Sequence, residues 1–349
     1  MSEFWSNRRV LLTGHTGFKG SWLSLWLHGL GARVTGLALE PDATPNLWSM
    51  IATEGVVASH ICDIRDAAAV RSVVAEARPE IVIHMAAQAL VRPSYADPLE
   101  TYATNVMGTA HVLDAVRGLP DLACVLVVTT DKVYENDGAG RPFSEGDRLG
   151  GHDPYSNSKA CAELVAQSFR DSFFVGVPVV TARAGNVIGG GDWSVDRLIP
   201  DAVRALDGGH PVRLRNPGAV RPWQHVLEPL GGYLAVVQAH AERREGAPLA
   251  VNFGPDPASF RTVAEVLESF SARFDGRPGW QRDGGDHPKE AAALTLTSDL
   301  AKRTLGWAPR LDFATTMQWT ADWYAAFREG ADMVAFTRRQ IAEYQELSP

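Results

Sequence analysis

Short apolar runs alternate with amphipathic segments through the first two-thirds of the chain. The runs predict six buried strands, at residues 10–13, 33–39, 56–61, 80–85, 123–130 and 177–184. Segments with apolar residues at helical spacing lie between them, at 20–30, 66–77, 99–117 and 155–174, and Asp66 is placed to cap the second of these. Strands that are apolar on both faces and alternate with helices are typical of a parallel sheet covered on both sides. The pattern therefore predicts an α/β fold with a Rossmann-type doubly wound parallel sheet.

The pattern changes after Ala184. Gly189–Gly191 and the segment 208–223 are rich in Gly, Pro and Arg, and helical spacing returns at 226–243, 262–274 and 312–328. We therefore predict two domains, a Rossmann domain over residues 1–184 and a smaller C-terminal α+β lobe over residues 185–349. Segments of such a lobe often return to the first domain, so the boundary at 185 is an approximate one.

Composition limits the classes of protein that fit. Of the 349 residues, 45% are hydrophobic and 21% charged, as in an ordinary globular protein. The net charge of −8 and the lack of a basic stripe argue against a nucleic-acid surface. The three cysteines, at 62, 124 and 161, have no metal-like spacing and suit a reducing compartment. The first residues do not form a signal-peptide pattern and no run approaches about 18 apolar residues, so we expect a cytoplasmic protein with neither a metal nor a membrane span.

A glycine-rich loop joins the first predicted strand to the first predicted helix. Its glycines, Gly14, Gly17 and Gly20, follow the spacing G-x-x-G-x-x-G. Glycines permit a tight turn and let a pyrophosphate approach the backbone, while the helix start offers free N–H groups. The alternative is a turn that merely packs a helix on a strand. In this β/α setting the loop indicates a dinucleotide site within residues 1–184.

Two features bear on which dinucleotide binds. The second strand ends at Leu39, so the ribose-binding acid is missing from its usual place and Glu40 stands one position later. Glu40 favours NAD, because its charge would repel a 2′-phosphate, whereas Lys19 in the loop could attract one and leaves NADP open. Asp63, after the third strand, could accept a hydrogen bond from an adenine amino group or serve only as a turn residue.

Tyr155 and Lys159 stand four residues apart, which places a phenol and an ammonium on one helix face. A phenol is a weak base near neutrality, but a neighbouring cation lowers its pKa. The pair follows the strand-end run Thr129–Asp131 by about 25 residues in the β/α frame. We interpret it as a catalytic pair, the alternative being a solvent-facing pair on a helix.

Taken together, these motifs resemble the extended short-chain dehydrogenase/reductases that act on nucleotide sugars. The resemblance rests on the glycine loop, on segment 84–87, on Asn105 and on the runs at 129–131 and 155–159, and it covers nearly the whole chain. Lys132 follows Asp131 where dTDP-glucose and GDP-mannose 4,6-dehydratases have glutamate. That lysine and the long runs 153–159, 183–193 and 221–229 are similar to the branch that acts on CDP-glucose.

The resemblance implies a lyase that uses NAD. Tyr155, aided by Thr130 and Lys159, would oxidise carbon 4 of the glucose, and Asp131 and Lys132 would act as acid and base in the loss of water. The alternative for Lys132 is a structural cation paired with Asp131. The residues implied to contact NAD are Gly14, Thr16, Gly17, Phe18, Lys19, Gly20, Asp63, Ile64, Ala86, Ala87, Gln88, Asn105, Thr129, Tyr155 and Lys159.

The resemblance also implies a set of substrate-binding residues and an oligomeric state. Arginine suits a sugar pyrophosphate because its fork binds phosphate in two places, although arginines can equally pack their stems on tryptophans. The residues implied to contact the substrate are Ser94, Asn186, Arg197, Arg215 and Arg221. Ser94 could instead serve only to hydrogen-bond within a turn. Helices 99–117 and 155–174 would form a homodimer, with a tetramer possible, and the product would serve deoxysugar and lipopolysaccharide O-antigen synthesis.

Two other functions stay open at this stage. One is a different nucleotide-sugar enzyme of the same group, either an epimerase or a dehydratase for another nucleotide. The other is a binding protein that kept the fold and lost catalysis, against which the intact Asp131, Tyr155 and Lys159 argue.

Overall fold

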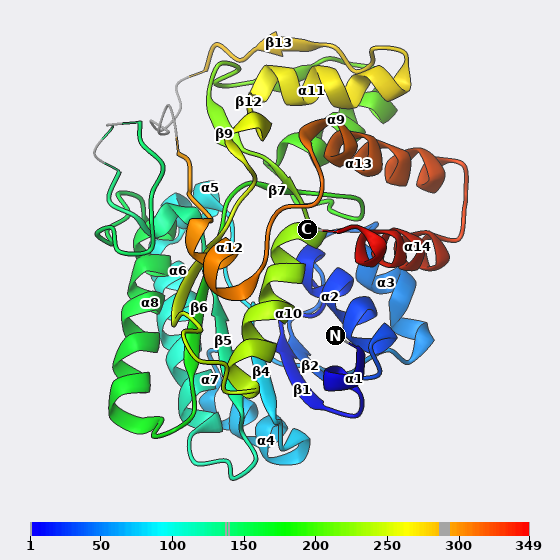
Figure 1. Ribbon diagram of the computed structural model, residues 1–349. Helices are drawn as coiled ribbons and strands as arrows, with labels where there is room; N and C mark the ends of the chain where they lie inside the picture. The colour runs from blue at the N-terminus through cyan, green and yellow to red at the C-terminus, as the bar shows by residue number, and fades with distance from the viewer. Residues whose placement is uncertain (1, 137, 139, 286–293, 349) are drawn as a thin grey trace.

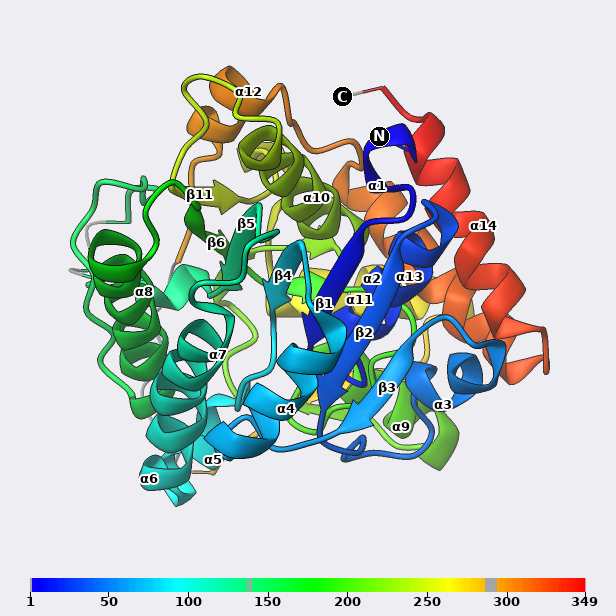
Figure 2. The same cartoon turned by 90° about the horizontal axis from the view of Figure 1, so that it is seen from below.

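A computed structural model describes residues 2–136, 138, 140–285 and 294–348. Its centre is a seven-stranded parallel sheet in the order β11-β6-β5-β4-β1-β2-β3 (Figures 1 and 2). The strands are β1 Arg9–Thr13, β2 Arg33–Ala38, β3 Ala58–Ile61, β4 Ile81–His84, β5 Cys124–Val128, β6 Val179–Ala184 and β11 Ala250–Phe253. The predicted doubly wound parallel sheet is thereby confirmed, with all six predicted strands present.

Helices cover both faces of the sheet, as apolar strands require. On one face lie α4 Ala67–Ala77, α7 Gly108–Val116 and α8 Pro154–Phe173, and on the other α2 Phe18–Gly29 and α10 Leu227–Ala241 (Figure 2). Each face has its own hydrophobic core: Val70, Val112 and Ala166 belong to one, and Trp22, Leu230 and Leu234 to the other. Asp66 caps α4 as predicted, accepting hydrogen bonds from the backbone N–H groups of Ala68 and Ala69.

The predicted helix 99–117 is in fact three pieces. It comprises α6 Pro98–Tyr102, the π-helical turn η2 Ala103–Met107 and α7. A π turn adds one residue to the helical repeat and is often found at functional sites. Here it carries Asn105, which is almost fully buried.

The residues after Ala184 divide between an upper lobe and the central sheet. The upper lobe holds α9 Leu198–Gly208, β8 Val212–Leu214, β9 Val220–Pro222, β12 Phe260–Thr262, α11 Val263–Ser271, β13 Trp280–Arg282 and α13 Phe313–Arg328 (Figure 1). In contrast, β11 pairs with β6 at the edge of the sheet and α10 packs on its face. The chain therefore returns to the first domain.

The remaining elements are short connections or C-terminal helices. They are α1 Ser2–Trp5, α3 Leu47–Ile51, η1 Ala52–Glu54, α5 Val91–Ala96, η3 Asp131–Val133, β7 Val187–Ile188, β10 Gln224–His225, η4 Pro257–Ser259, η5 Ala272–Phe274, α12 Asp299–Leu305 and α14 Met333–Glu346. Within the described ranges, none of the helices combines the length and the apolar character needed to cross a bilayer.

Candidate active site

The glycine loop lies tightly against the ends of two strands. Gly14 has a φ of +77°, and a Cβ there would lie 2.8 Å from the Ala86 nitrogen. A Cβ at Gly20 would lie 2.0 Å from the Gly14 carbonyl oxygen. Helix α2 starts directly after Gly17, and no side chain caps it. The loop thus combines close packing that only glycine allows with an uncapped helix start, as the glycine spacing predicted.

Several side chains around this loop are already engaged within the protein. The Thr16 hydroxyl donates to the Leu39 carbonyl oxygen at 2.8 Å. The Asp63 carboxylate accepts from the Arg65 guanidinium at 2.6 and 2.8 Å, and these bonds hold the pKa of Asp63 below its usual range. Asp63 also accepts from the Arg65 backbone N–H, which is the turn geometry considered for it above.

Lys19 extends from the loop toward the catalytic pair. Its ammonium donates to the Tyr233 hydroxyl at 3.3 Å and lies over the Tyr233 ring. Burial, followed by the charges of Arg197 and Lys159, lowers the pKa of Lys19 to about 7, while Asp131 acts in the opposite direction. The loop, the catalytic helix and the upper lobe therefore converge on one region.

The predicted catalytic pair, Tyr155 and Lys159, lies at the start of α8. Asp153 caps the helix and Pro154 occupies its first turn, both favourable at a helix start. Tyr155 and Lys159 are both more than nine-tenths buried, and Lys159 Nζ donates to the Val128 carbonyl oxygen at 3.2 Å. Such burial excludes the alternative of a solvent-facing pair.

Burial and neighbouring charges shift the pKa values of Tyr155 and Lys159. Burial raises the pKa of Tyr155, while the Lys132 charge and a hydrogen bond with Thr130 act to lower it. Burial lowers the pKa of Lys159 to about 8, and the Glu163 charge opposes that change. An ammonium and a phenol with shifted pKa values in one enclosed space are typical of proton-transfer sites.

Residues 130–132 bring a carboxyl and an amine beside this pair. The Thr130 hydroxyl donates to Asp131 Oδ1 at 3.0 Å, and Lys132 Nζ contacts the same oxygen at 3.4 Å. Asp131 is fully buried, and its Oδ2 has no hydrogen-bond partner among the described residues. The Lys132 side chain is 30% exposed. An acceptor left without a partner in a buried site is a position that a ligand hydroxyl can fill.

Asn105 ties the loop after β4 to the catalytic helix. Its Oδ1 accepts from the Gln88 backbone N–H, and its Nδ2 donates to the Gln88 carbonyl oxygen and to Ser158 Oγ, each at 2.9 Å. Ser158 in turn donates to the Tyr155 carbonyl oxygen at 2.7 Å. Ala86 and Ala87, in the same loop, are half-buried, and Ile64 is buried.

Three of the residues expected to bind the substrate, Arg197, Asn186 and Arg221, differ in their present hydrogen bonds. Arg197 lies near Tyr155 and Lys19 and donates to Asp192 Oδ2 at 2.9 Å. Asn186 Oδ1 is buried with no partner among the described residues. Arg221 is buried and donates to the Val220 carbonyl oxygen at 2.8 Å.

Ser94 contacts the start of the catalytic helix, and Arg215 lies near α9. Ser94 is fully buried; its hydroxyl donates to the Val91 carbonyl oxygen at 2.6 Å and accepts from the Tyr155 backbone N–H at 3.1 Å. It therefore supports the start of the catalytic helix. Arg215 lies near Asp201 in α9: burial raises the pKa of Asp201, and the Arg215 charge is among those that oppose the rise.

A buried ion pair behind Lys159 was missed from the sequence. Glu163 in α8 and Arg183 in β6 pair at 2.9 Å, and Thr129 donates to Glu163 Oε1 at 2.5 Å. One signal was available, because Arg183 is a charged residue inside an otherwise apolar strand.

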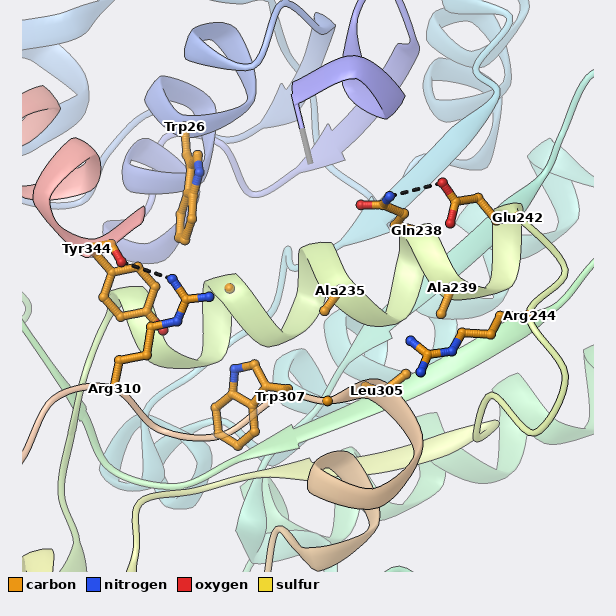
Figure 3. A pocket seen from close by; sticks show the side chains of 12 residues that line it. Trp26, Ala235, Gln238, Ala239, Glu242, Arg244, Leu305, Trp307, Arg310 and Tyr344 are labelled. Carbon is orange, nitrogen blue, oxygen red and sulfur yellow. Dashed lines mark hydrogen bonds between the residues drawn. The ribbon is translucent and has the colours of Figure 1, made fainter. Parts of the chain in front are cut away.

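A separate cavity of about 270 Å³ lies away from these groups, between α10, α2, α12 and α14 (Figure 3). Trp26, Leu305, Arg310 and Tyr344 line it, and it shares no residue with the site above. Among the described residues, no three His, Cys, Asp or Glu side chains gather as a metal site would require.

Comparison with known proteins gives close matches. The family described as GDP-mannose 4,6 dehydratase matches residues 11–320. CDP-glucose 4,6-dehydratase from Salmonella typhimurium is 46% identical over 98% of this chain and 97% of that protein. dTDP-glucose 4,6-dehydratase from Xanthomonas campestris pv. campestris is 30% identical over 90% of this chain and 92% of that protein. The structure of dTDP-glucose 4,6-dehydratase from Bacillus anthracis in complex with NAD has a TM-score of 0.78 at 23% identity, covering 93% of this chain and 99% of that one.

Proposed function

The chain belongs to the GDP-mannose 4,6-dehydratase family, and we propose that it converts CDP-glucose to CDP-4-keto-6-deoxyglucose and water with NAD as cofactor. One observation carries the reaction type: the buried Tyr155–Lys159 pair and the Asp131–Lys132 pair share one enclosed region. The relative at 46% identity over nearly the whole chain supports CDP-glucose as the substrate.

The glycine loop fits NAD. Its close packing at Gly14 and Gly20 and the uncapped start of α2 form a cradle for a pyrophosphate, and Lys19 adds an amine beside it. When bound, NAD would supply an acceptor for the hydride of carbon 4 and the source of hydride for carbon 6. The residues proposed to hold it are Gly14, Thr16, Gly17, Phe18, Lys19, Gly20, Asp63, Ile64, Ala86, Ala87, Gln88, Asn105, Thr129, Tyr155 and Lys159.

The hydroxyls of Thr16 and Thr129 donate within the protein, so these two residues would meet the cofactor through other atoms. Glu40 is exposed directly after Leu39, and its charge disfavours the 2′-phosphate of NADP. Titration of the protein with NAD and with NADP tests this preference, and equal affinity would exclude it.

In the oxidation half, Tyr155 takes the proton of the glucose 4-hydroxyl while carbon 4 becomes a ketone. The Lys132 charge acts to lower the pKa of Tyr155, and Thr130 orients the phenol oxygen. Lys159, one helical turn after Tyr155, is assigned the same stabilising role. The ketone then makes the proton on carbon 5 acidic.

In the elimination half, Lys132 removes the carbon-5 proton and Asp131 protonates the departing 6-hydroxyl, so that water leaves. Lys132 then returns its proton to carbon 5 as carbon 6 is reduced, and the proton taken up by Tyr155 replaces the one that Asp131 lost. The elimination requires Lys132 as a neutral base and Asp131 as a neutral acid, and the two side chains contact each other at 3.4 Å. The unpartnered Asp131 Oδ2 is the oxygen that we assign to the 6-hydroxyl.

Substrate binding is assigned to the upper lobe. Asn186, Arg197, Arg215 and Arg221 would hold the sugar pyrophosphate. The buried Asn186 Oδ1, which has no partner among the described residues, can accept a hydrogen from a substrate hydroxyl. Ser94 would contact the glucose only by exchanging one of its present hydrogen bonds. We therefore assign it to supporting the backbone of Tyr155.

We also propose a homodimer formed by the helices on one face, with a tetramer as the larger alternative. Apolar side chains stand exposed there, including Leu99 at 80%, Met107 at 51% and Leu164 at 54%. Light scattering after size exclusion measures the assembly. The product would enter cytoplasmic deoxysugar synthesis for O-antigen.

The reaction is tested with pure protein, NAD and a panel of nucleotide glucoses carrying CDP, dTDP, GDP and UDP. We expect a 4-keto product, detected by its near-ultraviolet absorbance in alkali, from CDP-glucose above all. An epimer from any of them would favour an epimerase. Binding of CDP-glucose and NAD without product would favour a protein that has lost catalysis.

A further inference from the structure

We propose that Glu163 is a positioning residue that acts on the reaction through Lys159, with Arg183 holding it in place. The inference rests on the proposed function, since it concerns the same catalytic pair. It begins from a buried ion pair that the mechanism above does not use.

The pair is built into the contact between the catalytic helix and the sheet. Glu163 and Arg183 are each less than 5% exposed. Two parallel bonds join them, from Arg183 Nε to Oε1 and from its terminal nitrogen to Oε2, both at 2.9 Å. Such a two-point contact fixes both the distance and the orientation of the carboxylate.

Other bonds restrain both partners. Arg183 also donates to the Tyr134 hydroxyl at 2.8 Å, and Tyr134 donates to Asn252 Oδ1 in β11 at 2.7 Å. Thr129 donates to Glu163 Oε1 at 2.5 Å. The carboxylate thus receives three hydrogen bonds from β6 and from the end of β5, a set that serves an ionised group.

Glu163 stands one helical turn after Lys159, so both side chains leave α8 on the face that meets β5 and β6. Lys159 Nζ bonds the Val128 carbonyl oxygen and Glu163 bonds the next residue, Thr129. Two adjacent bonds therefore join the helix of the oxidation step to the segment that leads into Asp131. A shift of one would displace the other.

The charge of Glu163, although paired with Arg183, also acts on Lys159. Lys19 from α2 lies close enough for the two ammonium groups to repel. His84 from β4 is buried, and burial and the Lys159 charge lower its pKa to about 3, so it is neutral. Burial lowers the pKa of Lys159 to about 8, and the Glu163 charge opposes this. Without that charge, the ammonium that Tyr155 depends on would be lost at a lower pH.

The test is the charge of Lys159 in Glu163→Gln, which keeps the shape of the side chain. Lysine labelled with ¹³C at Cε is titrated by NMR in cofactor-free protein, and the Lys159 signal is assigned by its loss in Lys159→Met. We expect its midpoint to fall by about one pH unit or more, the usual effect of an adjacent opposite charge. The alkaline limb of the turnover profile should move down equally. Glu80→Gln, which breaks the Glu80–Arg8 pair before β4, is the matched control and should move neither.

The Lys159 titration midpoint and the alkaline limb of turnover test the proposed role of Glu163. A midpoint and a limb that stay in place in folded Glu163→Gln overturn the proposal and leave a structural ion pair. If Glu163→Gln does not fold, the double variant E163M/R183M takes its place, because replacing both partners of a buried pair by apolar residues is often tolerated. Failure of the wild type to convert CDP-glucose would count against the proposed function instead, and the NMR titration would still test the effect on Lys159.

Discussion

Glu228 makes the stability of this protein depend on pH in a direction that the structure determines. It lies in α10 and is about 1% exposed. Its Oε1 accepts from the backbone N–H groups of Arg310 and Leu311 at 2.9 and 2.7 Å, and its Oε2 accepts from the Tyr344 hydroxyl at 2.8 Å. Despite these bonds, burial raises the pKa of Glu228 from 4.5 to about 7.

The direction in which stability changes with pH follows from the linkage between protonation and folding. A group whose pKa is raised on folding contributes stability that is fully present below its unfolded pKa of 4.5 and is lost as the pH rises through about 7. Each pKa unit corresponds to about 1.4 kcal/mol, so the loss amounts to roughly 3 kcal/mol in the free energy of unfolding. Above neutrality the native protein holds a buried carboxylate that the unfolded chain would leave in water.

Glu228→Gln removes this loss while keeping the contacts. The amide oxygen can accept both backbone N–H groups, and the amide nitrogen can donate to Tyr344. Urea unfolding at about pH 5 and about pH 9 should show the variant more stable than the wild type at the higher pH by up to ~3 kcal/mol, with little difference at the lower.

Glu80→Gln is the control of opposite sign. Burial acts to raise the pKa of Glu80, but hydrogen bonds from the backbone of Arg9 and the side chain of Arg8 hold it below its usual range. That variant should lose stability at high pH and little at low pH. A Glu228→Gln variant that is less stable than the wild type at about pH 9 would refute the reasoning.

Three further substitutions test the catalytic assignments. Lys132→Ala should slow water loss at least ~100-fold while carbon-4 oxidation continues, seen as reduced-nicotinamide absorbance when CDP-glucose is added; normal turnover with normal deuterium exchange at carbon 5 would exclude Lys132 as the base. Tyr155→Phe should abolish the oxidation and leave the circular-dichroism spectrum unchanged, and retained turnover would contradict its role. Gly185→Ala would place a Cβ 2.7 Å from Pro222 Cγ and 3.0 Å from Asp131 Oδ2 and should impair elimination, whereas Gly218→Ala, whose Cβ would meet no neighbouring group within 4 Å, should not; equal rates in the two variants would show that Asp131 need not keep its position.

The sheet could be predicted because its signal is local. Each of the six strands before Ala184 is an apolar run, and each is followed by a helical pattern or a turn. Parallel pairing and two covered faces follow from that alternation alone. The glycine loop could be placed for the same reason, since the strand before it and the helix after it are both adjacent in the chain.

Contacts between distant residues could not be predicted in this way. β11 is four residues long and follows the C-terminal end of α10, and only its pairing with β6 identifies it as a sheet strand. The π turn at Asn105 has no distinct pattern, since an inserted residue leaves the apolar spacing on either side nearly intact. The Glu163–Arg183 pair joins a helix to a strand, and neither residue alone reveals its partner.

The end of β5 explains why the site depends on such contacts. Thr129 and Thr130 are adjacent in extended backbone, so their side chains leave on opposite sides. Thr129 bonds Glu163 beneath the catalytic helix, and Thr130 bonds Asp131 and meets Tyr155. A shift of one residue would exchange the two directions and separate the oxidation pair from the elimination pair. The sequence can therefore nominate each residue proposed for catalysis, but their proposed cooperation depends on how the end of β5 lies against α8, which the Lys159 and Glu163 bonds join.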